Sequence, residues 1–255
     1  MESRRGEVNG MKFEIVAASE IGARVADLLA EQLRQKPESV LGMTTGSSPI
    51  KYGIFQEWIR REAEGELDFA HATFINPDEW VGIDSEHPES FQAFMNEHLF
   101  RHLRTKRKPS HIPNGAAENL LDECSRFEQL LRELQYVDWQ LMGLGLNGHI
   151  AFIEPADSIP ASTYVADIDE ENQLTRSSHF RTPQEVPKQS ITIGLEAVMK
   201  ARSIVLVAAG ENKADIVATA FRGPITTRVP ASLLQLHPNV TVILDEGSAK
   251  RIGIV

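Results

Sequence analysis

One short glycine-rich stretch contains two side chains suited to proton transfer, a histidine and a glutamate, together with an asparagine. The segment Gly143–Pro155 contains Asn147, His149 and Glu154 and follows an apolar run typical of a strand. Histidine exchanges a proton near neutral pH, and a carboxylate that hydrogen-bonds one ring nitrogen keeps the other nitrogen available. The segment also has G-x-G-x-x-G spacing, but prolines follow too soon for the long helix of a dinucleotide site. The pattern therefore favours a general acid–base site.

A second candidate is a turn with the features of an anion site. Thr45, Gly46, Ser47 and Ser48 follow a strand-like run and precede Pro49, which suits a first helical position. Backbone N–H groups at a helix start bind anions, and glycine allows a ligand to come close to the backbone. There is no Gly-Lys-[Ser/Thr] ending, so this is not a Walker loop. A capped strand-to-helix turn without a ligand is an equally good interpretation of the spacing.

Two more charged positions follow predicted strands. Asp78 and Glu79 come shortly after the apolar run 72–75. Neighbouring side chains on an extended chain point to opposite sides, so we expect one carboxylate to face a cleft and the other a structural partner. Lys213 follows the run 203–209 in the first turn of a predicted helix, where the helix dipole disfavours a cation unless an anion is shared. A solvated acidic loop and an exposed surface lysine are the ordinary alternatives.

No metal or organic cofactor is predicted. His98 and His102 are four residues apart, as two ligands on a helix would be, but no third ligand is evident. Cys124 is the single cysteine, which excludes an intrachain disulfide and a cysteine-rich metal site.

The composition limits the classes of partner. The chain has 255 residues and a formal net charge of −10, which argues against broad binding to nucleic acid but not against one small anion. No apolar run approaches the roughly 20 residues that cross a bilayer, so we expect no membrane partner and a cytoplasmic protein. Whether the chain forms a homo-oligomer is left open. Residues 1–10 are polar and are expected to be a loose leader, with 11–255 as a single catalytic domain.

The elements that position these residues alternate between strand and helix patterns. Strands are expected near 12–17, 39–43, 72–75, 139–142, 203–209 and 240–244, with helical patterns between them. This alternation predicts an α/β fold: a doubly wound, mostly parallel sheet with helices on both faces, in a Rossmann-like three-layer arrangement. The stretch Pro155–Gln189 is rich in proline and polar residues and is expected to be irregular, as a lid or as a peripheral excursion.

The ordered motifs resemble those of the glucosamine-6-phosphate deaminase/isomerase family and, more distantly, of 6-phosphogluconolactonase. They extend through almost the whole chain: Thr45–Pro49, Asp78–Gly82, Glu86–Phe91, Gly143–Pro155, Ile191–Leu195, Gly210–Lys213 and Pro230–His237. The run His149-Ile150-Ala151-Phe152 is similar to the deaminase branch, since the lactonase branch usually has Thr-Ala-Ser after its histidine.

The resemblance implies roles for the candidate residues. Asp78 matches the base that moves a proton between C2 and C1 of the sugar. Asn147, His149 and Glu154 match the ring-opening group, with His149 as the proton carrier. The turn Thr45–Ser48 and Lys213 match phosphate contacts. The implied substrate is a small sugar phosphate, and the implied reaction opens an amino-sugar ring, isomerises aldose to ketose and releases ammonia without a cofactor.

Two departures from the family pattern leave alternatives open. Ile153 stands where the family usually has asparagine, which would remove a polar group beside Glu154. The family's phosphate-binding arginine has no clean equivalent, since Ser177 and Ser178 occupy the expected place between Arg176 and Arg181. The alternatives to glucosamine-6-phosphate are galactosamine-6-phosphate as the substrate, a lactonase reaction, and a non-enzymatic sugar-phosphate sensor.

Overall fold

The main sheet of the computed structural model has seven strands, six of them parallel. The structure describes residues 4–168, 180, 182 and 185–253. In their order across the sheet, the strands are β1 (Arg4–Val8), β2 (Met11–Ile15), β10 (Val240–Leu244), β9 (Ile204–Ala208), β6 (Trp139–Gly143), β3 (Val40–Gly42) and β4 (Thr73–Ile75). Only β1 runs antiparallel to its neighbour. The doubly wound, mostly parallel sheet predicted from the sequence is confirmed.

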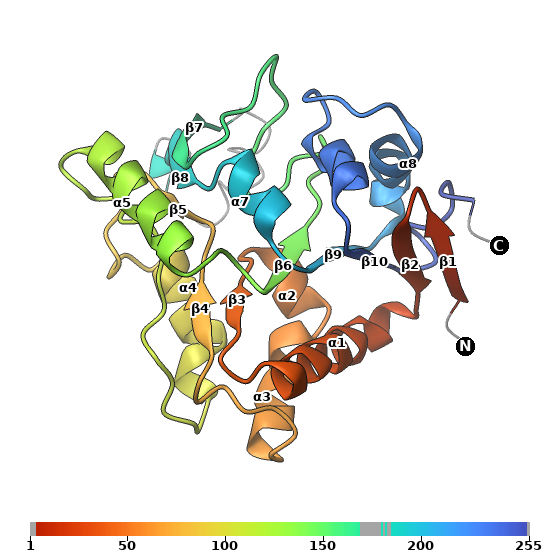
Figure 1. Ribbon diagram of the computed structural model, residues 1–255, viewed down its shortest axis with the longest axis horizontal. Helices are drawn as coiled ribbons and strands as arrows, with labels where there is room; N and C mark the ends of the chain where they lie inside the picture. The colour runs from red at the N-terminus through yellow and green to blue at the C-terminus, as the bar shows by residue number, and fades with distance from the viewer. Residues whose placement is uncertain (1–3, 169–179, 181, 183–184, 254–255) are drawn as a thin grey trace.

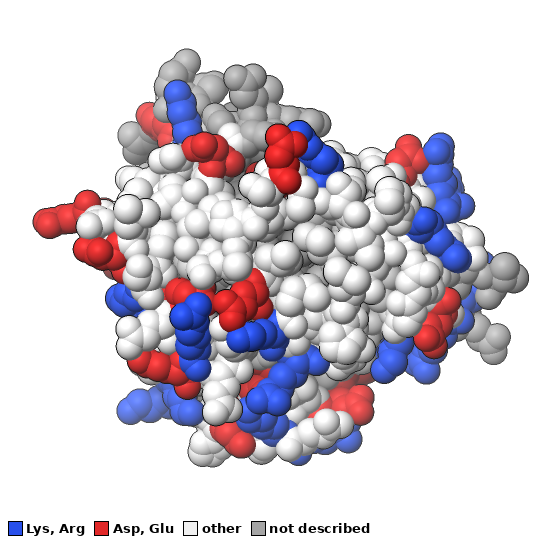
Figure 2. All heavy atoms as spheres, turned by 45° about the horizontal axis from the view of Figure 1, so that its top comes forward, with Lys and Arg blue, Asp and Glu red and all other residues white. Residues whose placement is uncertain are grey.

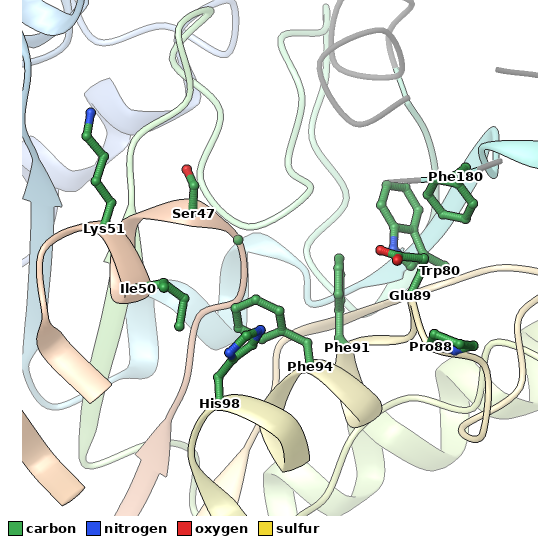
Figure 3. Close-up of a pocket in the computed structure, with 11 residues that line it drawn as sticks. Ser47, Ile50, Lys51, Trp80, Pro88, Glu89, Phe91, Phe94, His98 and Phe180 are labelled. Carbon is green, nitrogen blue, oxygen red and sulfur yellow. The ribbon is translucent and has the colours of Figure 1, made fainter. Parts of the chain in front are cut away.

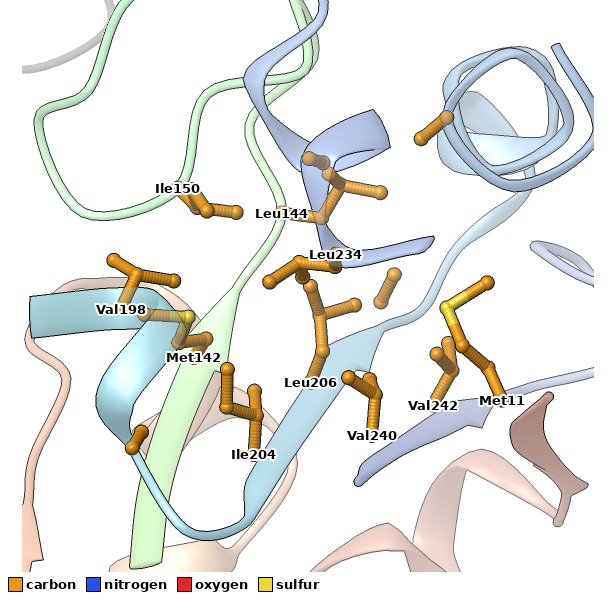
Figure 4. Close-up of a cluster of buried hydrophobic side chains, with 14 of the residues drawn as sticks. Met11, Met142, Leu144, Ile150, Val198, Ile204, Leu206, Leu234, Val240 and Val242 are labelled. Carbon is orange, nitrogen blue, oxygen red and sulfur yellow. The ribbon is translucent and has the colours of Figure 1, made fainter. Parts of the chain in front are cut away.

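Helices cover both faces of this sheet (Figure 1). One face packs against α1 (Ile21–Gln35), α3 (Ile54–Ala63) and α4 (Phe91–His98), and the other against α5 (Leu120–Glu133), α7 (Leu195–Lys200) and α8 (Ala214–Arg222). Strand β9 shows why its apolar run is continuous: Ile204 and Leu206 enter one core, while Val205 and Val207 enter the other. Figure 4 shows the first of these cores, with Leu206 beside side chains from the neighbouring strands.

The amino-terminal segment differs from the loose leader predicted over residues 1–10. Arg4–Val8 form β1, which pairs with β2 in a hairpin whose loop is Asn9-Gly10. Both loop residues have positive φ, 51° and 77°, as a type I′ turn requires. The Asn-Gly pair was the available sequence signal. The assignment of 11–255 to a single catalytic domain stays a prediction.

A second, smaller sheet was not predicted. It has the order β5 (Asp78–Trp80), β8 (Gln189–Thr192) and β7 (Tyr164–Asp167), all antiparallel. Strand β7 lies inside the stretch 155–189 that was expected to be irregular, while residues 169–179, 181 and 183–184 of that stretch lie outside the described residues. Among the helices that the structure describes, none is long and apolar enough to cross a membrane.

Candidate active site

The predicted site residues lie beyond the carboxyl ends of neighbouring parallel strands. Thr45–Ser48 follow β3, the loop 144–154 follows β6, and Lys213 follows β9. The chain passes outward from β3 to β4 and later from β6 to β9 in the opposite direction, so β3 and β6 flank the switch point of the sheet. Ligands of open α/β sheets bind at this place.

His149 is connected to Glu154 through Asn147. The Asn147 Oδ1 atom accepts hydrogen bonds from the His149 backbone N–H, at 3.1 Å, and from His149 Nδ1, at 2.8 Å. Asn147 Nδ2 in turn donates to Glu154 Oε2 at 2.7 Å. Because an amide oxygen only accepts, the contact assigns the proton to Nδ1 and leaves the lone pair of the neutral ring at Nε2.

The role of the carboxylate differs from the direct contact expected from the sequence. Glu154 Oε1 is 3.7 Å from His149 Nδ1, too far for a hydrogen bond. The asparagine occupies the intervening position and holds both groups, so Glu154 orients Asn147 and Asn147 sets the tautomer of the ring.

Gly145 makes room for the imidazole. A Cβ atom at residue 145 would lie 2.2 Å from His149 Nδ1, closer than any real contact. At Gly143, the last residue of β6, a Cβ atom would meet nothing within 4 Å. The His149 ring therefore requires a glycine at residue 145, whereas residue 143 has room for a side chain.

Asp78 and Glu79 occupy opposite sides of β5, as strand alternation predicts. Glu79 is 3% exposed and accepts hydrogen bonds from the backbone N–H groups of Phe91, at 2.9 Å, and Gln92, at 3.1 Å, which begin α4. Burial nevertheless raises the pKa of Glu79 to about 7, against the effect of its backbone donors. Glu79 thus has the structural partner, and Asp78, also buried, lies on the other face of the strand.

Asp78 is linked to the His149 loop through β8. Asp78 pairs with Thr192 across the small sheet, and the Thr192 hydroxyl accepts a hydrogen bond from the Phe152 N–H at 3.3 Å.

Ile153, which follows Phe152, is fully buried in a core that also contains Ile150 and Ile193. The Ile153 side chain therefore packs in the core. The sequence predicted that isoleucine here would remove a polar group beside Glu154, but this side chain does not point into the site.

The Thr45–Ser48 turn and Lys213 approach the site from two sides. Gly46 has φ 98°, and a Cβ atom there would meet nothing within 4 Å, so open space adjoins this turn. The short helix α2 (Ser47–Lys51) begins within this turn, at Ser47. Lys213 Nζ donates to the Leu144 carbonyl oxygen at 2.5 Å, which brings the lysine to the His149 loop, and burial lowers its pKa to about 8. The positions of Arg176, Ser177, Ser178 and Arg181 lie outside the described residues.

An apolar cavity of about 390 Å³ adjoins the Thr45–Ser48 turn, and the sequence did not predict it. Figure 3 shows Ser47 and Ile50 on one side and aromatic rings from β5 and α4 on the other. It is lined by Gly46, Ser47, Ile50, Lys51, Trp80, Pro88, Glu89, Phe91, Phe94, His98 and Phe180. The available signal was the i, i+4 pair Phe94 and His98, which the helix α4 presents to this cavity. Phe94 also packs against the edge of the core.

The surface charge is mixed. On the face shown in Figure 2, acidic and basic side chains are interspersed around a central area that has neither. Within the described ranges, no group of three histidine, cysteine or carboxylate side chains is arranged to hold a metal ion. The partly buried ammonium of Lys213 lies next to the His149 loop, and Lys51 lines the adjoining cavity.

Comparison with known proteins identifies the family of the chain. Residues 14–243 match the family described as glucosamine-6-phosphate isomerases/6-phosphogluconolactonase. Glucosamine-6-phosphate deaminase of Thermoanaerobacter pseudethanolicus is 40% identical over 91% of both chains, and that of Rhodopirellula baltica is 40% identical over 96% of this chain and 97% of its own. A solved structure described as a monomeric glucosamine-6-phosphate deaminase is 34% identical, covers 94% of this chain and 99% of its own, and has a TM-score of 0.86. A 6-phosphogluconolactonase from Thermotoga maritima shares the fold, with a TM-score of 0.71 at 13% identity over 92% of this chain and 99% of its own. The chain belongs to the family of glucosamine-6-phosphate isomerases and 6-phosphogluconolactonases.

Proposed function

We propose that the protein is a glucosamine-6-phosphate deaminase, which converts glucosamine-6-phosphate and one water to fructose-6-phosphate and ammonia. Relatives at 40% identity over nine-tenths of both chains have this activity in their names. The geometry on which the proposal rests is the hydrogen-bonded series Glu154–Asn147–His149, because it prepares one ring nitrogen as a proton carrier. A cytoplasmic location stays a prediction.

In the proposed reaction, His149 opens the sugar ring. Opening a cyclic hemiacetal removes a proton from the C1 hydroxyl and adds one to the ring oxygen, and a neutral imidazole with its lone pair at Nε2 can do both in turn. Asp78 then takes the C2 proton and returns it to C1, which converts the aldose to a 2-imino ketose precursor. Water then adds to C2, and its two protons pass to the nitrogen. The C2–N bond breaks, which releases ammonia and leaves a ketone at C2.

The phosphate is proposed to bind between the Thr45–Ser48 turn and Lys213. These groups come from different strands, β3 and β9, and approach the His149 loop from both sides. A phosphate held here is fixed at C6, distant from the bonds that change at C1 and C2. Its binding therefore orients the substrate, while the proton transfers belong to Asp78 and His149.

Ammonia release from glucosamine-6-phosphate tests the proposal, with galactosamine-6-phosphate and a phosphorylated sugar lactone assayed in parallel. We expect turnover of the first substrate in preference to the other two. Asp78→Asn is expected to lose at least a hundredfold in kcat while it still binds fructose-6-phosphate, since general-base steps contribute roughly 10²–10⁴-fold. Folded protein that turns over none of the three would refute the enzyme, and a fully active Asp78→Asn variant would remove Asp78 as the base.

A further inference from the structure

The peptide group between Ala209 and Gly210 is held from both sides by side chains. The Tyr52 hydroxyl donates to the Ala209 carbonyl oxygen at 2.9 Å. The Gly210 N–H donates to both carboxylate oxygens of Asp245, each at 3.0 Å. A peptide plane with partners on both its C=O and its N–H has its orientation fixed, since rotating it would break a bond on each side.

The orientation of this peptide sets the position of Lys213. Gly210 has φ 101°, a conformation that turns the chain sharply from β9 into the short 3₁₀ turn Glu211–Lys213. The Lys213 N–H donates to the Gly210 carbonyl oxygen at 3.0 Å, which closes the turn. The Lys213 ammonium then reaches Leu144, so a rotation at the Ala209–Gly210 peptide would displace it from the loop that contains His149.

Tyr52 also contacts the Thr45–Ser48 turn. Its backbone N–H donates to the Ser48 carbonyl oxygen at 3.1 Å, at the end of the single-turn helix α2. The same residue thus contacts the Thr45–Ser48 turn through its backbone and the start of the Lys213 turn through its hydroxyl. These two turns follow β3 and β9, which are separated in the sheet by β6.

We propose that Tyr52 is a positioning residue that fixes the separation between the Thr45–Ser48 turn and Lys213, and that it thereby sets the affinity for the substrate phosphate. This inference rests on the proposed function, because it takes both turns to contact the phosphate. An anion held between two turns binds less tightly when one of them shifts, whereas the chemistry at C1 and C2 depends on other loops.

The test is the variant Tyr52→Phe, which removes only the hydroxyl group. We expect the KM for glucosamine-6-phosphate and the dissociation constant of inorganic phosphate to rise together by about threefold to tenfold, the range of one uncharged hydrogen bond, with kcat within twofold of the wild type. Tyr136→Phe is the matched control. It removes a hydroxyl that donates to Glu196 at 3.1 Å, away from both turns, and should leave both constants unchanged.

Phosphate binding is measured by calorimetry, so the result does not depend on turnover. Unchanged phosphate affinity in folded Tyr52→Phe overturns the inference, as does a fall in kcat at constant KM or a fall in melting temperature alone. Wild-type protein that binds phosphate but releases no ammonia would refute the proposed reaction, and the Tyr52 comparison would still decide the inference. Wild-type protein that releases ammonia but does not bind phosphate overturns the inference and leaves the proposed reaction standing.

Discussion

The affinity of the site for a sugar phosphate should fall as the pH rises through about 8. Lys213 is the cation involved, and burial lowers its pKa from the ordinary value of 10.5 to about 8. The charged lysine attracts the phosphate dianion and the neutral lysine does not. Because Lys213 of the free enzyme loses its proton near pH 8, phosphate binding at a higher pH requires that the lysine is first protonated again.

The size of the effect follows from the titration. At pH 7 about nine-tenths of the free enzyme has a charged Lys213, and at pH 9 about one-tenth, if the pKa is about 8. The dissociation constant should therefore increase by roughly tenfold between these pH values, which corresponds to about 1.4 kcal/mol. A lysine with the ordinary pKa would be almost fully charged at both, and its binding curve would be flat.

Fructose-6-phosphate is the suitable ligand for this measurement, because it lacks the amino group that titrates in the same range in the substrate. Its dissociation constant should be measured by calorimetry at intervals from pH 7 to pH 9. Lys213→Arg keeps a permanent charge and should give a pH-independent constant, whereas Lys213→Gln should bind weakly at every pH. A wild-type constant that is the same at pH 7 and pH 9 would contradict the argument from burial.

Three further predictions concern groups around the site. Gly145→Ala should lower kcat by at least tenfold, because its Cβ would displace the His149 ring, while Gly143→Ala should retain activity. Glu154→Gln should lower kcat by roughly 10- to 100-fold with KM within twofold, as expected for a group that acts through an intermediate hydrogen bond. Glu79 has a raised pKa, so its stabilising contribution is present below pH 4.5 and lost as pH rises through about 7. Chemical denaturation should show about 2 kcal/mol less stability at pH 8 than at pH 5, and Glu79→Gln should flatten this difference.

The sequence was sufficient for the parts of the fold that have local signals. The parallel strand β9 is a continuous apolar run and β10 is apolar except for Thr241, and the predicted runs 203–209 and 240–244 differ from them by at most one residue at each end. The antiparallel sheet was missed because its three short strands mix polar and apolar residues and contain no long apolar run. Moreover, β5 and β8 pair across more than 100 residues of sequence, which leaves no periodicity to detect.

The site was predicted as a set of residue types but not as a set of contacts. The closeness of His149 and Glu154 in the sequence suggested that they act together. It could not show that the Asn147 side chain lies between them, because their spacing in the sequence is equally compatible with a direct contact. Tyr52 had no motif of its own. Its hydroxyl partner is a backbone carbonyl 157 residues away, and any residue type has that carbonyl.

The small sheet explains how groups from separate loops keep a fixed geometry. Asp78 lies in β5 rather than in a loop, and its partner Thr192 in β8 also holds the Phe152 N–H of the His149 loop. The proposed base and proton carrier are therefore joined through one strand, whose hydrogen bonds resist relative motion more strongly than two independent loops would. The phosphate turns are joined separately, through Tyr52. Changes at Tyr52 should accordingly affect binding, and changes at β8 should affect the proton transfers, because the two connections share no residue.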